Sequence, residues 1–172
     1  MGIEIERKFL LDNQTWRDQV HSVSHIRQGY FVAAQALTQG LAKASVRVRI
    51  ENGAAELNIK AVGLGIERAE YAYLIPMSDA ISMLQELCSG VLEKRRHRVR
   101  VAGFCFEIDE FLGENAGLLV AEIELLDADA VFPRPDWLGR EVSDCPRYYN
   151  VQLIDYPYCR WSTAERAGAR EC

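Results

Sequence analysis

A two-residue alternation of charged and apolar side chains runs through most of this chain of 172 residues and limits its fold more than any other feature. The opening residues show it first, with Glu4, Glu6 and Lys8 at alternate positions and Ile3 and Ile5 between them. In an extended strand, side chains two residues apart point to the same face. The alternation therefore predicts a β-strand with one charged face and one apolar face.

The same pattern predicts further strands that are joined mostly by short turns. A hairpin is expected at Asn52-Gly53, a pair typical of tight two-residue turns. Helices are expected over residues 13–22, 79–88 and 147–154. We therefore expect an α+β fold dominated by an antiparallel sheet. Its strands are predicted over residues 3–11, 26–34, 44–51, 56–62, 67–75, 93–101, 104–111 and 117–127, with an irregular segment over 133–146.

The charges on the polar faces are segregated by strand, with acidic pairs on the terminal strands and basic pairs on the central ones. An open sheet with one solvated face explains alternation in any single strand. The segregation favours a second arrangement, in which about eight antiparallel strands close into a barrel or tunnel with a charged interior and helices packed outside. An interior rich in Lys and Arg repels itself unless an anion fills it, and grouped carboxylates need cations. The expected ligand is a polyphosphate bound with Mg²⁺ or Mn²⁺.

Composition narrows the class of protein. The net charge of −5 argues against a general nucleic-acid-binding protein. Apolar runs fall short of the roughly 20 residues that span a bilayer, so no membrane association is expected. The first residues enter a strand directly rather than a signal peptide. Five cysteines without a CxxC pair indicate free thiols in a reduced, cytoplasmic protein.

The strands carry motifs that occur together in one known family. Glu4-Ile5-Glu6-Arg7-Lys8 is similar to its N-terminal Glu-x-Glu-x-Lys hallmark, and the chain resembles the triphosphate tunnel metalloenzymes, or CYTH superfamily, from Gly2 to about Leu153. Ala72 stands where the family often has a second glutamate after Glu70. The other matching motifs are Arg27-Gln28-Gly29-Tyr30, Val46-Arg47-Val48-Arg49, Leu57-Asn58-Ile59-Lys60, Arg68-Ala69-Glu70-Tyr71, Glu93-Lys94-Arg95-Arg96, Phe106-Glu107-Ile108-Asp109, Glu122-Ile123-Glu124, Gly139-Arg140-Glu141-Val142 and Tyr149-Asn150.

The resemblance implies an eight-stranded antiparallel tunnel and a hydrolase that acts on phosphoric anhydrides. The closest likeness is to small bacterial inorganic triphosphatases, which implies cleavage of tripolyphosphate to pyrophosphate and phosphate. Residues 1–161 would form the single domain, and residues 162–172 a mobile tail. The implied metal ligands for Mg²⁺ or Mn²⁺ are Glu4, Glu6, Asp109, Glu122 and Glu124. The implied substrate-binding residues are Lys8, Arg27, Arg47, Arg49, Lys60, Lys94 and Arg96, and the implied catalytic residues are Glu4, Glu6 and Lys94, the last as a candidate base.

Three other functions stay open at this point. A class IV-type adenylate cyclase would also need to recognise adenine, and the sequence contains no readable purine-binding pattern. A thiamine triphosphatase could hold the thiamine rings with an aromatic residue. A non-catalytic polyphosphate-binding module would need the cations alone, so the retained carboxylates favour an enzyme. The expected partner is a small-molecule triphosphate, and a homodimer is one option for the oligomeric state.

Overall fold

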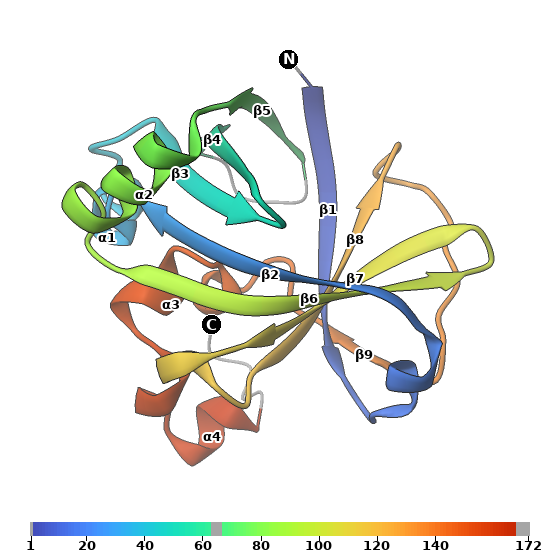
Figure 1. Ribbon diagram of the computed structural model, residues 1–172. Helices are drawn as coiled ribbons and strands as arrows, with labels where there is room; N and C mark the ends of the chain where they lie inside the picture. The colour runs from blue at the N-terminus through green and yellow to red at the C-terminus, as the bar shows by residue number, and fades with distance from the viewer. Residues whose placement is uncertain (1, 63–66, 168–172) are drawn as a thin grey trace.

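The computed structural model describes the backbone of residues 2–62 and 67–167 and the side chains of residues 5–62 and 69–167. Within this part of the chain, nine strands form one antiparallel sheet in the order β5-β4-β3-β2-β6-β7-β8-β1-β9 (Figure 1). The strands are β1 Gly2–Leu11, β2 Val20–Tyr30, β3 Ala44–Glu51, β4 Ala54–Ala61, β5 Glu67–Leu74, β6 Val91–Val101, β7 Phe104–Phe111, β8 Leu119–Leu125 and β9 Leu138–Glu141.

The helices are short and lie at the margins of the sheet (Figure 1). Ala80 and Leu84 of α2 are buried against Val48 and Ala55, which places this helix on β3 and β4. None of the helices in the described residues is long and apolar enough to cross a membrane. The helices are α1 Ala34–Thr38, α2 Met77–Glu86, α3 Gln152–Asp155 and α4 Thr163–Arg166, with 3-10 turns η1 Thr15–Gln19, η2 Gly113–Asn115, η3 Pro146–Tyr148 and η4 Tyr158–Arg160.

The prediction of an eight-stranded closed barrel is wrong. The segment expected to be irregular contains β9, so the sheet has nine strands, with β5 and β9 at the two ends of the strand order. β1 pairs with β8 along one edge and divides its other edge between two strands. Residues Gly2 to Ile5 pair with β5, whereas Phe9 and Leu11 pair with β9. Because β9 takes the second half of that edge, the sheet does not continue as a uniform closed ring.

The structure also corrects the element expected after β1. The helix predicted over residues 13–22 is limited to η1, because β2 begins at Val20 and pairs with β6 from its first residue. Val20 and Ser22 therefore pair with β6 instead of continuing a helix. In contrast, β3 and β7 have the predicted bounds, and Asn52 and Gly53 form the predicted hairpin with positive φ angles of 47° and 82°.

The apolar faces of the strands form the core on the side of the sheet away from the charged faces. Phe9, Phe106 and Ile123 belong to the largest buried cluster, together with Trp16 and Trp137 from the connecting segments. A second cluster joins β6, β7 and β8 to the C-terminal segment. The prediction that charged and apolar faces separate is therefore met in the packing, and it leaves the charged side chains around a cavity.

Two features of the C-terminal region bear on the sequence predictions. Residues 162–167, which begin the expected tail, contain α4, where Ser162 Oγ accepts a hydrogen bond from the Glu165 N–H at 3.3 Å. Residues 168–172 lie outside the described residues. Cys88, Cys105 and Cys159 are free thiols as expected, whereas Cys145 is disulfide-bonded, so the expectation of free thiols throughout is wrong.

Candidate active site

The charged faces of the strands surround a cavity of about 650 Å³. Strands from both halves of the sheet contribute to its walls, so residues far apart in the sequence meet there. Pro146 and residues 149–152 cover part of it from the C-terminal segment. The charged side chains that line it are Glu6, Lys8, Arg47, Arg49, Glu51, Glu56, Lys60, Glu70, Arg96, Arg98, Glu107, Glu122 and Glu124.

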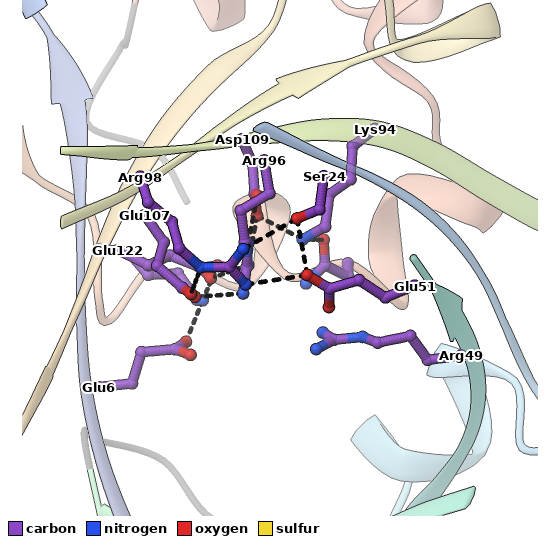
Figure 2. A network of polar contacts seen from close by, with 12 residues as sticks. Glu6, Ser24, Arg49, Glu51, Lys94, Arg96, Arg98, Glu107, Asp109 and Glu122 are labelled. Atoms are coloured by element: carbon purple, nitrogen blue, oxygen red, sulfur yellow. Dashed lines mark hydrogen bonds and ion pairs between the residues drawn. The ribbon is translucent and has the colours of Figure 1, made fainter. Parts of the chain in front are cut away.

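Arg49 lines this cavity and has no carboxylate partner among the described residues. It lies opposite Gln28 in the β2–β3 register, and its Nε donates to Gln28 Oε1 at 3.2 Å. Figure 2 shows its guanidinium apart from the neighbouring network of ion pairs. Burial, together with the charges of Arg47 and Arg96, lowers the pKa of Arg49 to about 10. A partly buried guanidinium without a carboxylate partner among the described residues favours the arrival of an anion.

A second group of cations lies on β3 and β4 and shares one carboxylate. Arg47 donates to Asn58 Oδ1 at 3.0 Å, and Asn58 in turn donates to Glu70 Oε1 at 3.3 Å. Lys60 Nζ lies 3.6 Å from the same Glu70 oxygen. Glu70 therefore lies between Arg47 and Lys60. Glu70 lines the cavity although position 72, two residues along the same strand face, is alanine.

Lys8 lies between two carboxylates at the opposite wall. Its ammonium donates to Glu6 and to Glu122, which faces it across the β1–β8 ladder. Burial opposes the charge of Lys8, but Glu122 and Glu6 outweigh it and raise the pKa of the ammonium above its ordinary value. Burial likewise works against ionised Glu122, whereas Lys8 and Arg96 lower its pKa well below the ordinary range. Both groups are therefore charged at neutral pH.

Arg96 ties together the acidic residues of β7 and β8. Its Nε and one terminal nitrogen each donate to Asp109 at 2.7 Å, and the same terminal nitrogen donates to Glu122 at 2.6 Å. The other terminal nitrogen contacts Glu107. Asp109 is fully buried, which disfavours its charge, but Arg96 and Lys94 outweigh burial and lower its pKa. Figure 2 shows this network in close view.

Lys94 lies behind the cavity wall and is 0% exposed. Its Nζ contacts Asp109 and lies 3.4 Å from Asn150 Oδ1. Burial lowers the pKa of Lys94 to about 8, although the Asp109 carboxylate acts in the opposite direction. Asn150 lines the cavity, so it stands between this amine and the space where a ligand would bind.

Arg98 on β6 links three further strands, β2, β3 and β7, at the end of the cavity nearest the β3–β4 hairpin. Its guanidinium donates to Glu107 at 3.0 Å, to Ser24 at 3.0 Å and to Glu51 at 2.8 Å (Figure 2). The hydroxyl of Ser24 also donates to Glu51, at 2.7 Å. With a carboxylate on either side, Arg98 is compensated in charge, in contrast to Arg49.

The metal-binding potential of the cavity lies in its carboxylates. Among the described residues, no group of three or more His, Cys, Asp or Glu side chains is gathered in a metal-binding arrangement. Glu6 and Glu122 do converge on one cation, the ammonium of Lys8. Glu124 faces Glu6 across the β1–β8 ladder, and the side chain of Glu4 lies outside the described residues. A donor set of carboxylate oxygens fits a hard divalent ion such as Mg²⁺ or Mn²⁺.

The structure brings most of the sequence-predicted site residues to this one cavity. It does not bring Arg27 there: that side chain is 44% exposed and pairs with Glu93 at 3.0 Å. Asp109 and Lys94 lie directly behind the wall rather than on it. The predicted residues that line the cavity are Glu6, Lys8, Arg47, Arg49, Lys60, Arg96, Glu122 and Glu124.

Several polar residues around the cavity were not among the predicted site residues. Asn58 and Glu107 share the strand faces of Lys60 and Asp109, so alternation alone was a signal for them. Gln28 shares its face with Tyr30, and the Gln28 side chain is fully buried. Asn150 is carried by the C-terminal segment, where no strand alternation points to the cavity. Its signal was membership of the Tyr149-Asn150 motif.

Comparison with known proteins places this geometry in a family. The model of the CYTH domain matches residues 2–149. The chain belongs to the CYTH domain family. A protein of Acetivibrio thermocellus named inorganic triphosphatase is 45% identical over 159 residues, which cover 92% of this chain and 97% of that protein.

A further relative of this CYTH protein and a similar solved structure carry the same name. An inorganic triphosphatase of Nitrosomonas europaea is 35% identical over 155 residues, which cover 87% of this chain and 95% of that protein. The crystal structure of the inorganic triphosphatase NE1496 superposes with a TM-score of 0.63 at 28% identity, covering 90% of this chain and 95% of that one. These relatives are similar over nearly their whole length.

Proposed function

We propose that this CYTH protein is a metal-dependent inorganic triphosphatase that hydrolyses tripolyphosphate to pyrophosphate and phosphate. The observation that carries the proposal is the partly buried Arg49 guanidinium, which lines the cavity without a carboxylate partner among the described residues. The relatives named inorganic triphosphatase, at 45% and 35% identity, support the same activity.

The cations of the cavity would hold the phosphate chain from several sides. Arg47 and Arg49 present planar guanidinium groups, which suit bidentate contacts to phosphate oxygens. Lys8 and Lys60 supply compact charges. During attack by water on a terminal phosphorus, a bridging P–O bond breaks and negative charge shifts to the leaving pyrophosphate. Fixed positive charges at these oxygens stabilise that change.

A divalent ion would complete the site at its carboxylates. Glu6, Glu122 and Glu124 would hold it, together with Glu4, whose side chain lies outside the described residues. When bound, such an ion neutralises charge on phosphoryl oxygens and lowers the pKa of a coordinated water. Lys8 would then be free to turn from Glu6 and Glu122 toward a phosphate. Asp109 is engaged by Arg96 and Lys94, so its part in binding a second ion stays a proposal.

Lys94 is our candidate for the group that accepts a proton from the attacking water. With its pKa lowered to about 8, a sizeable fraction of the amine is neutral in mildly alkaline solution. Asn150 Oδ1 lies 3.4 Å from Nζ, and Asn150 lines the cavity. In this role the neutral amine takes up the proton and becomes an ammonium beside Asp109.

Phosphate release from a panel of substrates tests the proposal. Tripolyphosphate, ATP and thiamine triphosphate are compared with and without Mg²⁺ or Mn²⁺. Metal-dependent release that is highest with tripolyphosphate is the expected result. Cyclic AMP and pyrophosphate from ATP would instead indicate a cyclase, and a preference for thiamine triphosphate would indicate that enzyme. Binding of tripolyphosphate without release from any substrate would indicate a binding module.

The remaining expectations concern the setting of the enzyme. We propose a small-molecule triphosphate as its partner, in line with the cavity and the relatives. The cytoplasmic location, the absence of nucleic-acid and membrane partners, and the option of a homodimer stay predictions from the sequence.

A further inference from the structure

We propose that Gln28 is a positioning residue that holds the Arg49 guanidinium toward the incoming phosphate, and that its neutral amide keeps the charge of Arg49 available for that phosphate. The inference rests on the proposed function, because it takes phosphate as the anion that Arg49 meets. It extends the site to a residue that need not touch the substrate.

The geometry of two neighbouring strands carries the first part of the argument. Gln28 on β2 and Arg49 on β3 are direct partners in the ladder, so their side chains start from adjacent points on the cavity face. Gln28 is 0% exposed, and its Oε1 accepts the Arg49 Nε–H at 3.2 Å. Fixing Nε at this edge leaves the two terminal nitrogens of the guanidinium for a bidentate contact with a phosphate.

The orientation of the Gln28 amide is itself fixed by a neighbour. Its Nε2 donates to the hydroxyl of Tyr30 at 3.1 Å, on the same strand and the same face. With the amide nitrogen held by Tyr30, the amide oxygen is the atom turned toward Arg49. Tyr30 also lines the cavity, so this chain of contacts runs along its wall.

The neutrality of Gln28 carries the second part of the argument. Lys8 and Arg96, two buried cations that line the cavity, both contact carboxylates. An arriving phosphate must compete with those carboxylates. At Arg49 the acceptor is an amide, which satisfies one donor without cancelling the charge. A carboxylate at position 28 would form a buried ion pair and occupy the same guanidinium.

Two variants at position 28, which differ in charge, test this role. Gln28→Glu preserves side-chain shape and adds an acid beside Arg49, whereas Gln28→Met removes the acceptor without adding charge. Gln19→Glu adds the same charge at an exposed position of η1 and serves as the control. Binding of tripolyphosphate is measured by calorimetry without metal, and KM and kcat are measured with metal. Thermal unfolding verifies that each variant is folded.

We expect Gln28→Glu to weaken tripolyphosphate binding by about tenfold or more, the worth of one charge-assisted hydrogen bond. Gln28→Met should weaken it less, by roughly threefold, because the Arg49 charge remains. KM should rise more than kcat falls, since ground-state binding is what changes. In an Arg49→Ala background, adding Gln28→Glu should change Kd by less than about twofold, because the interaction is already lost.

Binding by Gln28→Glu equal to that of wild type would overturn the proposal. So would the same weakening in the Arg49→Ala background, because Gln28 would then act without Arg49. The proposed function fails separately: wild-type protein that binds tripolyphosphate but releases no phosphate contradicts the enzyme and leaves the calorimetric comparison decisive for Gln28.

Discussion

At the scale of single residues, the partners of each cation distinguish the proposed substrate contacts from structural support. Arg98 pairs with Glu51 and Glu107, whereas the hydrogen-bond partner of Arg49 among the described residues is the amide of Gln28. Lys8 lies between these extremes, since its carboxylate partners are candidate metal ligands.

Replacing Arg49 with alanine removes a guanidinium that has no carboxylate partner among the described residues. We expect KM for tripolyphosphate to rise by about tenfold or more, the worth of a charge-assisted contact. Arg95→Ala, at an exposed position on the outer face of β6, is the control and should leave KM near the wild-type value. An unchanged KM in Arg49→Ala would exclude a phosphate contact at this residue.

Replacing Glu6 or Glu124 with glutamine removes a negative oxygen ligand at nearly constant shape. Metal-dependent phosphate release should fall by about 100-fold or more, since even groups outside the ligand set can cost that much. Glu86→Gln, an exposed position in α2, is the matched control. Wild-type turnover in both cavity variants would contradict the assignment of Glu6 and Glu124 as metal ligands.

The titration of Lys94 predicts how the rate depends on pH. Its pKa is lowered to about 8, so the neutral amine becomes the major form as pH rises through that value. If Lys94 accepts the proton, kcat should increase between about pH 7 and 9 and then level off. Lys94→Met should lose this rise. A rise that persists unchanged in Lys94→Met would assign the base elsewhere.

At the scale of elements, the β6–β7–β8 ladder is held together on the cavity side by charge as well as by backbone pairing. Arg96 faces Asp109 directly across β6 and β7, and it reaches Glu122 on β8. Asp109 is fully buried, so its negative charge depends on Arg96 and Lys94. Arg96, Asp109 and Glu122 thus contribute both to the stability of the sheet and to the candidate active site.

Removing the Arg96 side chain should therefore lower the free energy of unfolding. Arg96→Met leaves Asp109 and Glu122 with less compensation, and we expect a loss of about 3 kcal/mol in the free energy of unfolding. Urea denaturation measures it. Arg100→Met, exposed on the same strand, should change stability by less than about 0.5 kcal/mol. Equal losses in the two variants would contradict the role of Arg96 in the ladder.

At the scale of the whole molecule, apolar clusters on the outer side of the sheet hold its covering segments in place. Trp161 is buried against Tyr148 and Tyr158, with ring centroids 5.2 Å and 5.1 Å away. Its indole N–H donates to the Tyr156 carbonyl at 3.1 Å. The same segment carries Tyr149 and Asn150 to the cavity wall. Packing outside the sheet thereby positions part of the site.

Truncating Trp161 to alanine tests this coupling. We expect a loss of about 3 to 5 kcal/mol in the free energy of unfolding, as for other large buried aromatic residues. Leu126→Ala, at a fully exposed position, should cost less than about 0.5 kcal/mol. Thermal or urea unfolding distinguishes them, and a Trp161→Ala protein as stable as wild type would show that the C-terminal segment packs independently.

The sequence by itself determined which side chains share a face. Period-two alternation is a local property of a strand, so it located Glu6, Lys8, Arg47, Arg49 and Lys60 on charged faces that the structure brings to one cavity. The same alternation places Arg27 on the opposite strand face from Gln28. The family motif had suggested a site role for Arg27, but its side chain is exposed and pairs with Glu93. The bounds of β3 and β7 followed from the same local pattern.

Only the tertiary structure decided how the strands meet. β9 is four residues long, too short to show alternation, yet it takes one half of the β1 edge and overturns the closed barrel. Pairing between distant strands also placed Lys94 and Asp109 behind the wall and gave Arg49 an amide neighbour. Edge pairing and charge compensation depend on residues far apart in the chain, so a local pattern does not fix them.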